Sequence, residues 1–242
     1  MSPLRALELL RPRRGRTSRW LLFLLLTGLV VATRALAMQA SIWEWDDVVF
    51  GVALSNFAPQ AQVPQAPFYP GFVYLGRAAK LLLSDPVLSL TAVSAAASCL
   101  AVLLVFLYGL ELLGRPREAL SAALIFAFLP AVWFHAGVPL SDPAGLAAAL
   151  AACWLALKAR RKPRLLDVAA VAFGIAVSIR PQTALVALFP LGYSLVAASP
   201  KARRRGVVLG IVSVLSLYVA PILLAGGLSG PARFFGYQSS YE

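Results

Sequence analysis

Acidic side chains are scarce in this sequence, and histidine and cysteine are scarcer still. The 242 residues include 10 Asp or Glu, one His and two Cys. The sequence shows no metal-ligand cluster and no glycine-rich loop of the kind that binds phosphate. Both cysteines, Cys99 and Cys153, lie inside apolar runs, where small core residues are a better interpretation than a disulfide.

Apolar side chains are present in excess. Hydrophobic residues make up 60% of the chain, charged residues only 13%, and the mean hydropathy is +0.79. A soluble domain of this length has too little interior to bury so much apolar surface. Apolar runs recur at about 20 residues, the length that crosses a hydrocarbon core about 30 Å thick. The sequence therefore predicts an all-α, polytopic membrane protein.

We expect about seven transmembrane helices, rich in the small residues that let helices pack closely. They are predicted at Trp20–Ala37, Val87–Leu113, Ala119–Ala136, Ala144–Leu157, Leu165–Ile179, Thr183–Ala198 and Val207–Ala225. The first could instead be a signal peptide, because Ala35-Leu36-Ala37 resembles a cleavage site. Arg34 beside that site and the long apolar run favour an uncleaved anchor.

Positive charge gathers on one side of the predicted bundle. Seventeen of the 22 basic residues fall within residues 1–19, 114–118, 158–164 and 201–205, which share a side if seven spans alternate. The positive-inside rule makes that side cytoplasmic. We therefore expect a basic cytoplasmic tail (1–19), a transmembrane module (20–226) and a tail on the outer side (227–242), in the inner membrane of a bacterium. Anionic lipid headgroups, rather than nucleic acid, account for the net charge of +12.

The long outer loop, residues 38–86, predicts two helices lying in the membrane interface, over 42–57 and 71–83. The proline-rich segment between them, residues 59–70, is expected to be extended.

Two of the scarce acids, Asp46 and Asp47, stand side by side in the first of these helices. Adjacent side chains on a helix point about 100° apart, so one can face a site while the other is a second acceptor, a helix N-terminal charge or a metal ligand. The flanking Trp43 and Trp45 are expected to desolvate the carboxylates and raise their pKa towards that of a general base. Alternatively, the pair are solvated charges that begin an interfacial helix.

Further candidates are predicted on the same side of the membrane. Asp142 opens the fourth span, where it could also serve as a helix cap. Arg180 is a basic residue on the side that is poor in positive charge, so we expect it to pair with an anion, either an aspartate or a lipid phosphate. The remaining candidates are Arg77, Lys80, His135 and Glu44.

Four stretches together resemble the GT-C membrane glycosyltransferases, in particular the branch of protein O-mannosyltransferases and lipid A aminoarabinose transferases. They are Trp45-Asp46-Asp47-Val48-Val49-Phe50, Ala66-Pro67-Phe68-Tyr69-Pro70-Gly71, Leu140-Ser141-Asp142-Pro143 and Ile179-Arg180-Pro181-Gln182. Each motif is degenerate, and their order, spacing and common side carry the resemblance.

The resemblance implies an inverting transfer of a sugar from a polyprenyl-phosphate donor to an acceptor hydroxyl on a lipid, glycan or protein. It makes Asp46 the general base, Asp47 an acceptor-orienting residue or metal ligand, and Asp142 a supporting acid. Arg180, with Arg77 and Lys80, would bind the donor phosphate. Some members of the family use a divalent cation such as Mg²⁺ or Mn²⁺ and others do not, so the cofactor stays open. Members usually have more spans, so we expect this chain to match an amino-terminal module, with a partner subunit or further segment completing it.

A rival interpretation is a non-catalytic carrier, flippase or scaffold for a membrane glycosylation complex. A transporter should place ionisable residues near the middle of its spans. The predicted span interiors are nearly free of charge, which favours the enzyme, whereas a scaffold would need only the surface.

Overall fold

The computed structural model describes residues 16–42 and 44–226. Most of the predicted basic tail, Trp43 and the predicted outer tail lie outside these residues. Within them every regular element is helical, apart from an isolated β-bridge between Ala58 and Val63. The helices are α2 (Arg16–Ala37), α3 (Trp45–Ser55), η1 (Pro59–Ala61), α4 (Pro70–Leu83), α5 (Pro86–Leu113), α6 (Pro116–Ala127), α7 (Pro130–Ala136), α8 (Asp142–Ala159), α9 (Leu165–Ile179), α10 (Pro181–Ala197), α11 (Pro200–Val214), η2 (Leu215–Val219) and α12 (Ala220–Gly226). The predicted all-α class is confirmed.

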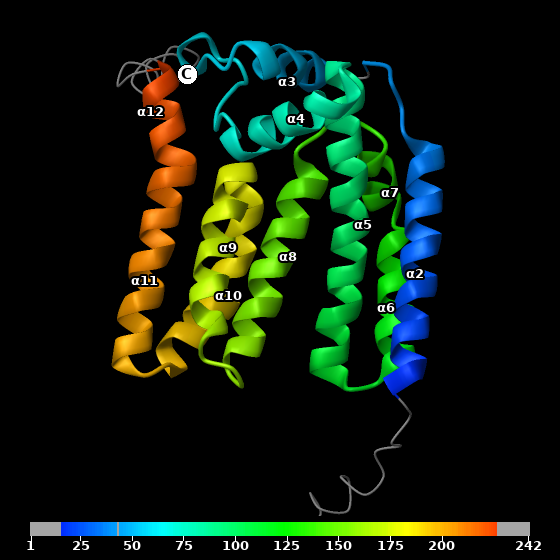
Figure 1. Ribbon diagram of the computed structural model, residues 1–242, viewed down its shortest axis with the longest axis vertical. Helices are drawn as coiled ribbons and strands as arrows, with labels where there is room; N and C mark the ends of the chain where they lie inside the picture. The colour runs from blue at the N-terminus through cyan, green and yellow to red at the C-terminus, as the bar shows by residue number, and fades with distance from the viewer. Residues whose placement is uncertain (1–15, 43, 227–242) are drawn as a thin grey trace, which may run out of the picture.

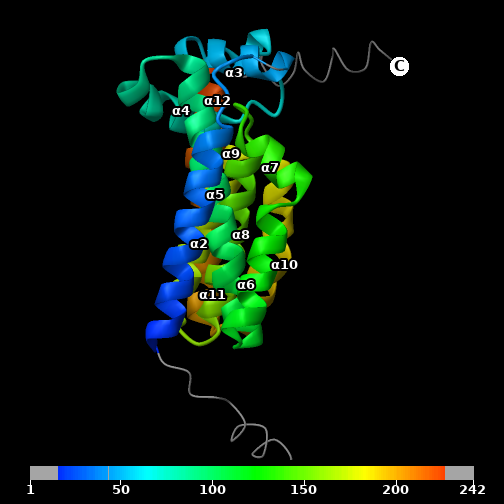
Figure 2. The ribbon, with the colours of Figure 1, turned by 90° about the vertical axis from the view of Figure 1, so that its right-hand side faces the viewer.

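The long helices run side by side, and α3 and α4 lie across one end of the bundle, called the capped end below (Figure 1). Turned by 90°, the bundle is a thinner slab (Figure 2). Each of the seven predicted spans coincides with helical structure. In the described residues four helices are long and apolar enough to cross a membrane, or five if the bent pair α6 and α7 is one span. The helices α9 and α10, of 15 and 17 residues, are apolar but shorter.

Proline marks where most helices begin. It occupies the first or second position of α4, α5, α6, α7, α8, α10 and α11. There its missing N–H costs nothing and its fixed φ suits the first turn. Glycine marks the end of α5. Gly114 takes φ +66°, a left-handed conformation that suits glycine and ends the helix.

The third predicted span, Ala119–Ala136, is not one helix. It breaks after Ala127 and resumes at Pro130, with a bend of 64° between α6 and α7. The physical reason is Pro130, which cannot donate a helical hydrogen bond and disfavours helical backbone in Leu129. The prediction of a continuous span was therefore wrong at this point.

An aromatic cluster packs α3 and α4 onto the bundle. The ring of Phe50 lies edge-on to Tyr69 and Phe72, with centroids 5.4 and 5.0 Å away, and all three side chains are buried. Leu90 of α5 and Ile179 of α9 belong to the same buried cluster. The capped end therefore has a core of its own, which fixes the helix that carries the acid pair.

Basic residues gather at the opposite end of the bundle, where the connections α5–α6, α8–α9 and α10–α11 lie (Figure 1). Three ion pairs occur there: Arg161–Glu111 at 2.8 Å, Arg205–Asp167 at 2.7 Å and Arg115–Glu118 at 2.7 Å. The last pair raises the pKa of the Arg115 guanidinium. The acidic candidates and the basic segments therefore occupy opposite ends of the described bundle.

Candidate active site

The two acids of α3 have different surroundings. Asp47 is buried, and its Oδ2 accepts a hydrogen bond of 3.0 Å from the backbone N–H of Glu44, the exposed residue that precedes the helix. A carboxylate in the first turn of a helix is also stabilised by the positive end of the helix dipole. Asp47 therefore takes one of the roles predicted for the acid pair, that of a negative charge at the N-terminus of a helix.

Asp46 is half-buried and points elsewhere. Its Oδ1 accepts a hydrogen bond from Nε2 of Gln65, in the loop between α3 and α4. Asp46 is one helical turn before Phe50 and so shares its face of α3. The side chain of Trp45 is 74% exposed, so it does not shield the acids as the sequence suggested, and Trp43 is outside the described residues.

The segment between α3 and α4 is compact, so the prediction that it is extended was wrong. The residues Pro59–Ala61 form a 3₁₀ turn, and Ala58 and Val63 exchange backbone hydrogen bonds of 2.8 and 3.1 Å. From the other side of the bundle, the hydroxyl of Tyr218 in η2 donates to the carbonyl of Pro67 at 3.1 Å. These bonds fold the loop over the capped end and hold Gln65 beside Asp46.

Arg180 lies between α9 and α10, whose Pro181 ends any helical continuation. Its Nη1 lies 3.0 Å from Oδ2 of Asp142 and donates to Oγ of Ser141 at 2.6 Å. The predicted pairing of Arg180 with an anion is therefore confirmed, with an aspartate as the partner. The side chains of Arg180 and Asp142 remain 25% and 39% exposed, so the pair is open to a ligand.

Two neighbours hold the Arg180 side chain in place. Its guanidinium lies over the ring of Tyr69, 5.6 Å from the centroid, a favourable cation–π distance. Its aliphatic stem crosses α8 at Gly145, where a Cβ would come within 2.5 Å of the Cβ of Arg180. Because Tyr69 also contacts Phe50, the aromatic cluster links the helix of Asp46 to Arg180.

The other predicted phosphate ligands, Arg77 and Lys80, are on α4. The guanidinium of Arg77 donates to the carbonyls of Leu54 at 2.9 Å and Ala53 at 3.2 Å. These carbonyls belong to the last turn of α3, which lacks helical partners, so Arg77 fastens α3 to α4. Lys80 is half-buried, one turn further along α4. Their binding of phosphate stays a prediction.

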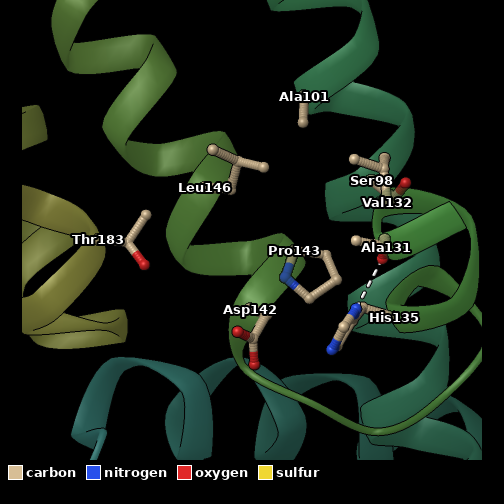
Figure 3. Close-up of a pocket in the computed structure, with 9 residues that line it drawn as sticks. All are labelled: Ser98, Ala101, Ala131, Val132, His135, Asp142, Pro143, Leu146 and Thr183. Atoms are coloured by element: carbon tan, nitrogen blue, oxygen red, sulfur yellow. Dashed lines mark hydrogen bonds between the residues drawn. The ribbon is translucent and has the colours of Figure 1, made fainter. Parts of the chain in front are cut away.

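A pocket of about 290 Å³ adjoins Asp142 (Figure 3). His135 of α7 is at its edge, and Nδ1 of the imidazole lies 2.6 Å from the carbonyl of Ala131. The pocket is lined by Ser98, Ala101, Ala131, Val132, His135, Asp142, Pro143, Leu146 and Thr183. The structure therefore brings His135 and Asp142 to one pocket.

Arg34 is a buried cation that the sequence interpretation missed. The side chain is 1% exposed; its Nε donates to Oγ of Ser98 at 3.2 Å, and Nη2 donates to the carbonyl of Ala127. The guanidinium also lies over Trp133, 4.8 Å from the ring centroid. The signal was present, because Arg34 follows the buried Leu26 and Val30 at steps of four along α2. Arg34 thus supplies donors at the break between α6 and α7.

A divalent cation has no assembled ligand set in the described residues. Asp46 is bound to Gln65 and Asp47 to the backbone of Glu44, and no group of three or more candidate ligand side chains converges. The carboxylates of Asp46 and Asp47 have separate partners and do not meet at one point.

Comparison with known proteins finds a match to one protein family. The family model described as dolichyl-phosphate-mannose-protein mannosyltransferase matches residues 63–224, about two thirds of the chain. The match contains Tyr69, His135, Asp142 and Arg180, and it begins after the acid pair of α3. No curated protein and no solved structure matches this chain.

Proposed function

The chain belongs to the dolichyl-phosphate-mannose-protein mannosyltransferase family and is a membrane glycosyltransferase of the GT-C type, and from this membership we propose that it transfers a sugar from a polyprenyl-phosphate donor to an acceptor hydroxyl. The observation that carries the proposal is the pairing of Arg180 with Asp142 beside Tyr69 at the capped end. A half-exposed carboxylate, Asp46, lies at that same end, on the helix whose Phe50 packs against Tyr69.

The reaction is a single displacement at the anomeric carbon of the sugar. Asp46 takes the proton of the acceptor hydroxyl, whose oxygen forms the new bond to the anomeric carbon. The bond from that carbon to the phosphate oxygen breaks, and polyprenyl phosphate leaves with the electron pair. Attack from the face opposite the leaving group inverts the configuration. Gln65 orients the carboxylate of Asp46 through its amide hydrogen bond.

Arg180 stabilises the charge that develops on the leaving phosphate. Among the described residues its side-chain hydrogen bonds are made by Nη1 alone, whereas a guanidinium carries five N–H donors. The donors on Nη2 and Nε remain for phosphate oxygens, and Asp142 keeps the guanidinium in position. We propose that Arg77 and Lys80 of α4 attract the same phosphate from a greater distance.

We place the site on the outer face of a bacterial inner membrane, with the amino terminus in the cytoplasm. The support is the separation of the basic segments from the capped end, because positively charged loops remain cytoplasmic. The acceptor is a hydroxyl on a lipid, a glycan or a protein, and a partner subunit contributes to its binding surface.

Replacing Arg180 by Gln should weaken donor binding by about 10- to 100-fold. A hydrogen bond to a charged group contributes about 1.5–3 kcal/mol, and 1.4 kcal/mol is tenfold in affinity. The test uses the purified chain in lipid vesicles with labelled polyprenyl-phosphate mannose, and a membrane extract supplies acceptors. Binding and transfer of the label are measured separately.

The matched control is Arg161→Gln. Arg161 also forms an ion pair, with Glu111, but at the opposite end of the bundle. It should leave donor binding unchanged. Transfer by the wild type supports the enzyme; donor binding without any transfer would favour the carrier or scaffold instead. Equal binding by the wild type and Arg180→Gln would reject the phosphate site.

A further inference from the structure

The pocket beside Asp142 shares that carboxylate with Arg180. Asp142 begins α8, where Oδ2 meets Arg180 and the same side chain lines the pocket (Figure 3). The walls come from four different helices: α5, α7, α8 and α10. A molecule whose phosphate binds Arg180 would therefore have its neighbouring atoms at the mouth of this pocket.

His135 supplies a hydrogen-bond acceptor at that mouth. Its Nδ1 lies 2.6 Å from the carbonyl of Ala131, and a carbonyl only accepts, so Nδ1 must carry the proton. In the neutral ring Nε2 then has a free lone pair. Figure 3 shows the imidazole on the same side of the pocket as Asp142.

Thr183 adds a hydroxyl that is available to a ligand. It is in the first turn of α10, half-buried, and its hydroxyl makes no hydrogen bond to another described residue. The polar lining consists of an imidazole, a carboxylate and the hydroxyls of Thr183 and Ser98, of which the Ser98 hydroxyl already accepts from Nε of Arg34. The other lining side chains are apolar. The carboxylate, the imidazole and the Thr183 hydroxyl suit neutral hydroxyl groups, which can donate to the carboxylate and the imidazole.

The size of the pocket indicates which part of a lipid-linked sugar can fit inside it. About 290 Å³ is the space of about ten water molecules. That space accommodates a monosaccharide and cannot hold a whole polyprenyl chain.

We infer that this pocket binds the sugar of the lipid-linked donor, with His135, Asp142 and Thr183 hydrogen-bonding its hydroxyl groups. The inference rests on the proposed function, which places the phosphate at Arg180. The sugar is joined directly to that phosphate, so it must lie next to Arg180, and Asp142 forms the boundary between the two sites. The apolar side chains of Ala101, Val132 and Leu146 close the deeper part of the pocket.

The test compares two probes of equal chain length: polyprenyl-phosphate mannose and polyprenyl phosphate without sugar. Binding of each to the purified full chain is measured in detergent micelles for Thr183→Val and His135→Phe. Each variant should weaken binding of the sugar-bearing probe by about three- to tenfold, the effect of one hydrogen bond, and leave the sugar-free probe unchanged. Thr27→Val is the control, because among the described residues the hydroxyl of Thr27 bonds only to the carbonyl of Phe23, within α2.

The remaining outcomes are distinct. Equal weakening of both probes, or no change in either, overturns the sugar site even if Arg180→Gln weakens both. Failure of the wild type to bind either probe overturns the proposed function and this inference with it. Thermal unfolding of each variant shows whether the protein is folded, and since Thr183 bonds no described side chain, Thr183→Val should unfold at the wild-type temperature.

Discussion

Replacing Asp46 by Asn is expected to reduce sugar transfer by about 10²–10⁴-fold, the usual contribution of a general base. The amide has nearly the shape of the carboxylate but cannot take the acceptor proton. Its oxygen can still accept the hydrogen bond from Gln65, so α3 should keep its place. The measurement is the initial rate of label transfer from polyprenyl-phosphate mannose in vesicles, alongside donor binding, which should stay at the wild-type value.

The matched control for this prediction is Asp85→Asn. Asp85 is also at the capped end, where its Oδ1 accepts from the backbone N–H of Leu88 at 2.7 Å and caps α5. Asn caps a helix about as well as Asp, so both stability and transfer should be unchanged. Transfer by Asp46→Asn at the wild-type rate, in folded protein, would remove Asp46 from the mechanism.

Replacing Gly71 by Ala should destabilise the capped end and suppress transfer at the same time. A Cβ at this position would lie 2.4 Å from Oγ of Ser178, 2.8 Å from its carbonyl carbon and 2.9 Å from the backbone nitrogen of Ile179. Two of these atoms are backbone and cannot move away alone, so α4 must shift from the end of α9. Overpacking of this kind costs about 1–3 kcal/mol.

The displacement would also affect the site, because Tyr69 precedes α4 and Arg180 follows α9. We expect the unfolding temperature to fall by about 2–4 °C for each kcal/mol lost, together with weaker donor binding. The control is Gly51→Ala on α3, where an added Cβ meets nothing within 4 Å. That variant should gain about 0.5–1 kcal/mol from helix propensity. Similar unfolding temperatures for Gly71→Ala and the wild type would contradict the close contact.

The part of the fold that follows from local pattern could be predicted. The apolar runs gave the long helices, since hydrophobic length is encoded residue by residue. The helices α3 and α4 also lie within the ranges predicted for two interfacial helices, apart from Pro70 at the start of α4. In the site, an anion for Arg180 could be expected because an unpaired arginine is costly near the membrane interior. That this anion would be Asp142 could not be predicted, because Asp142 and Arg180 are distant in sequence. They meet only when α8 packs against α9 and α10.

Other features depend on tertiary contacts that no local pattern records. The compact loop before α4 is held by Tyr218, far away in η2, whereas its prolines alone suggest an extended chain. The different surroundings of Asp46 and Asp47 follow from their separate partners, Gln65 in the loop before α4 and the backbone N–H of Glu44. Arg34 was visible as an arginine in an apolar run, but its partners come from the break at Pro130, which was itself missed.

The burial of Arg34 has a consequence for the order in which the protein is built. The helix α2 is synthesised before the groups that its arginine binds, Ser98 on α5, the carbonyl of Ala127 on α6 and the ring of Trp133 on α7. Helices first insert singly and then associate, so a newly inserted α2 must keep this cation near the headgroups, which its place in the last turn allows. The full set of partners of Arg34 exists only after α7 has been synthesised. The buried position of Arg34 therefore requires α2, α5, α6 and α7 to be packed together.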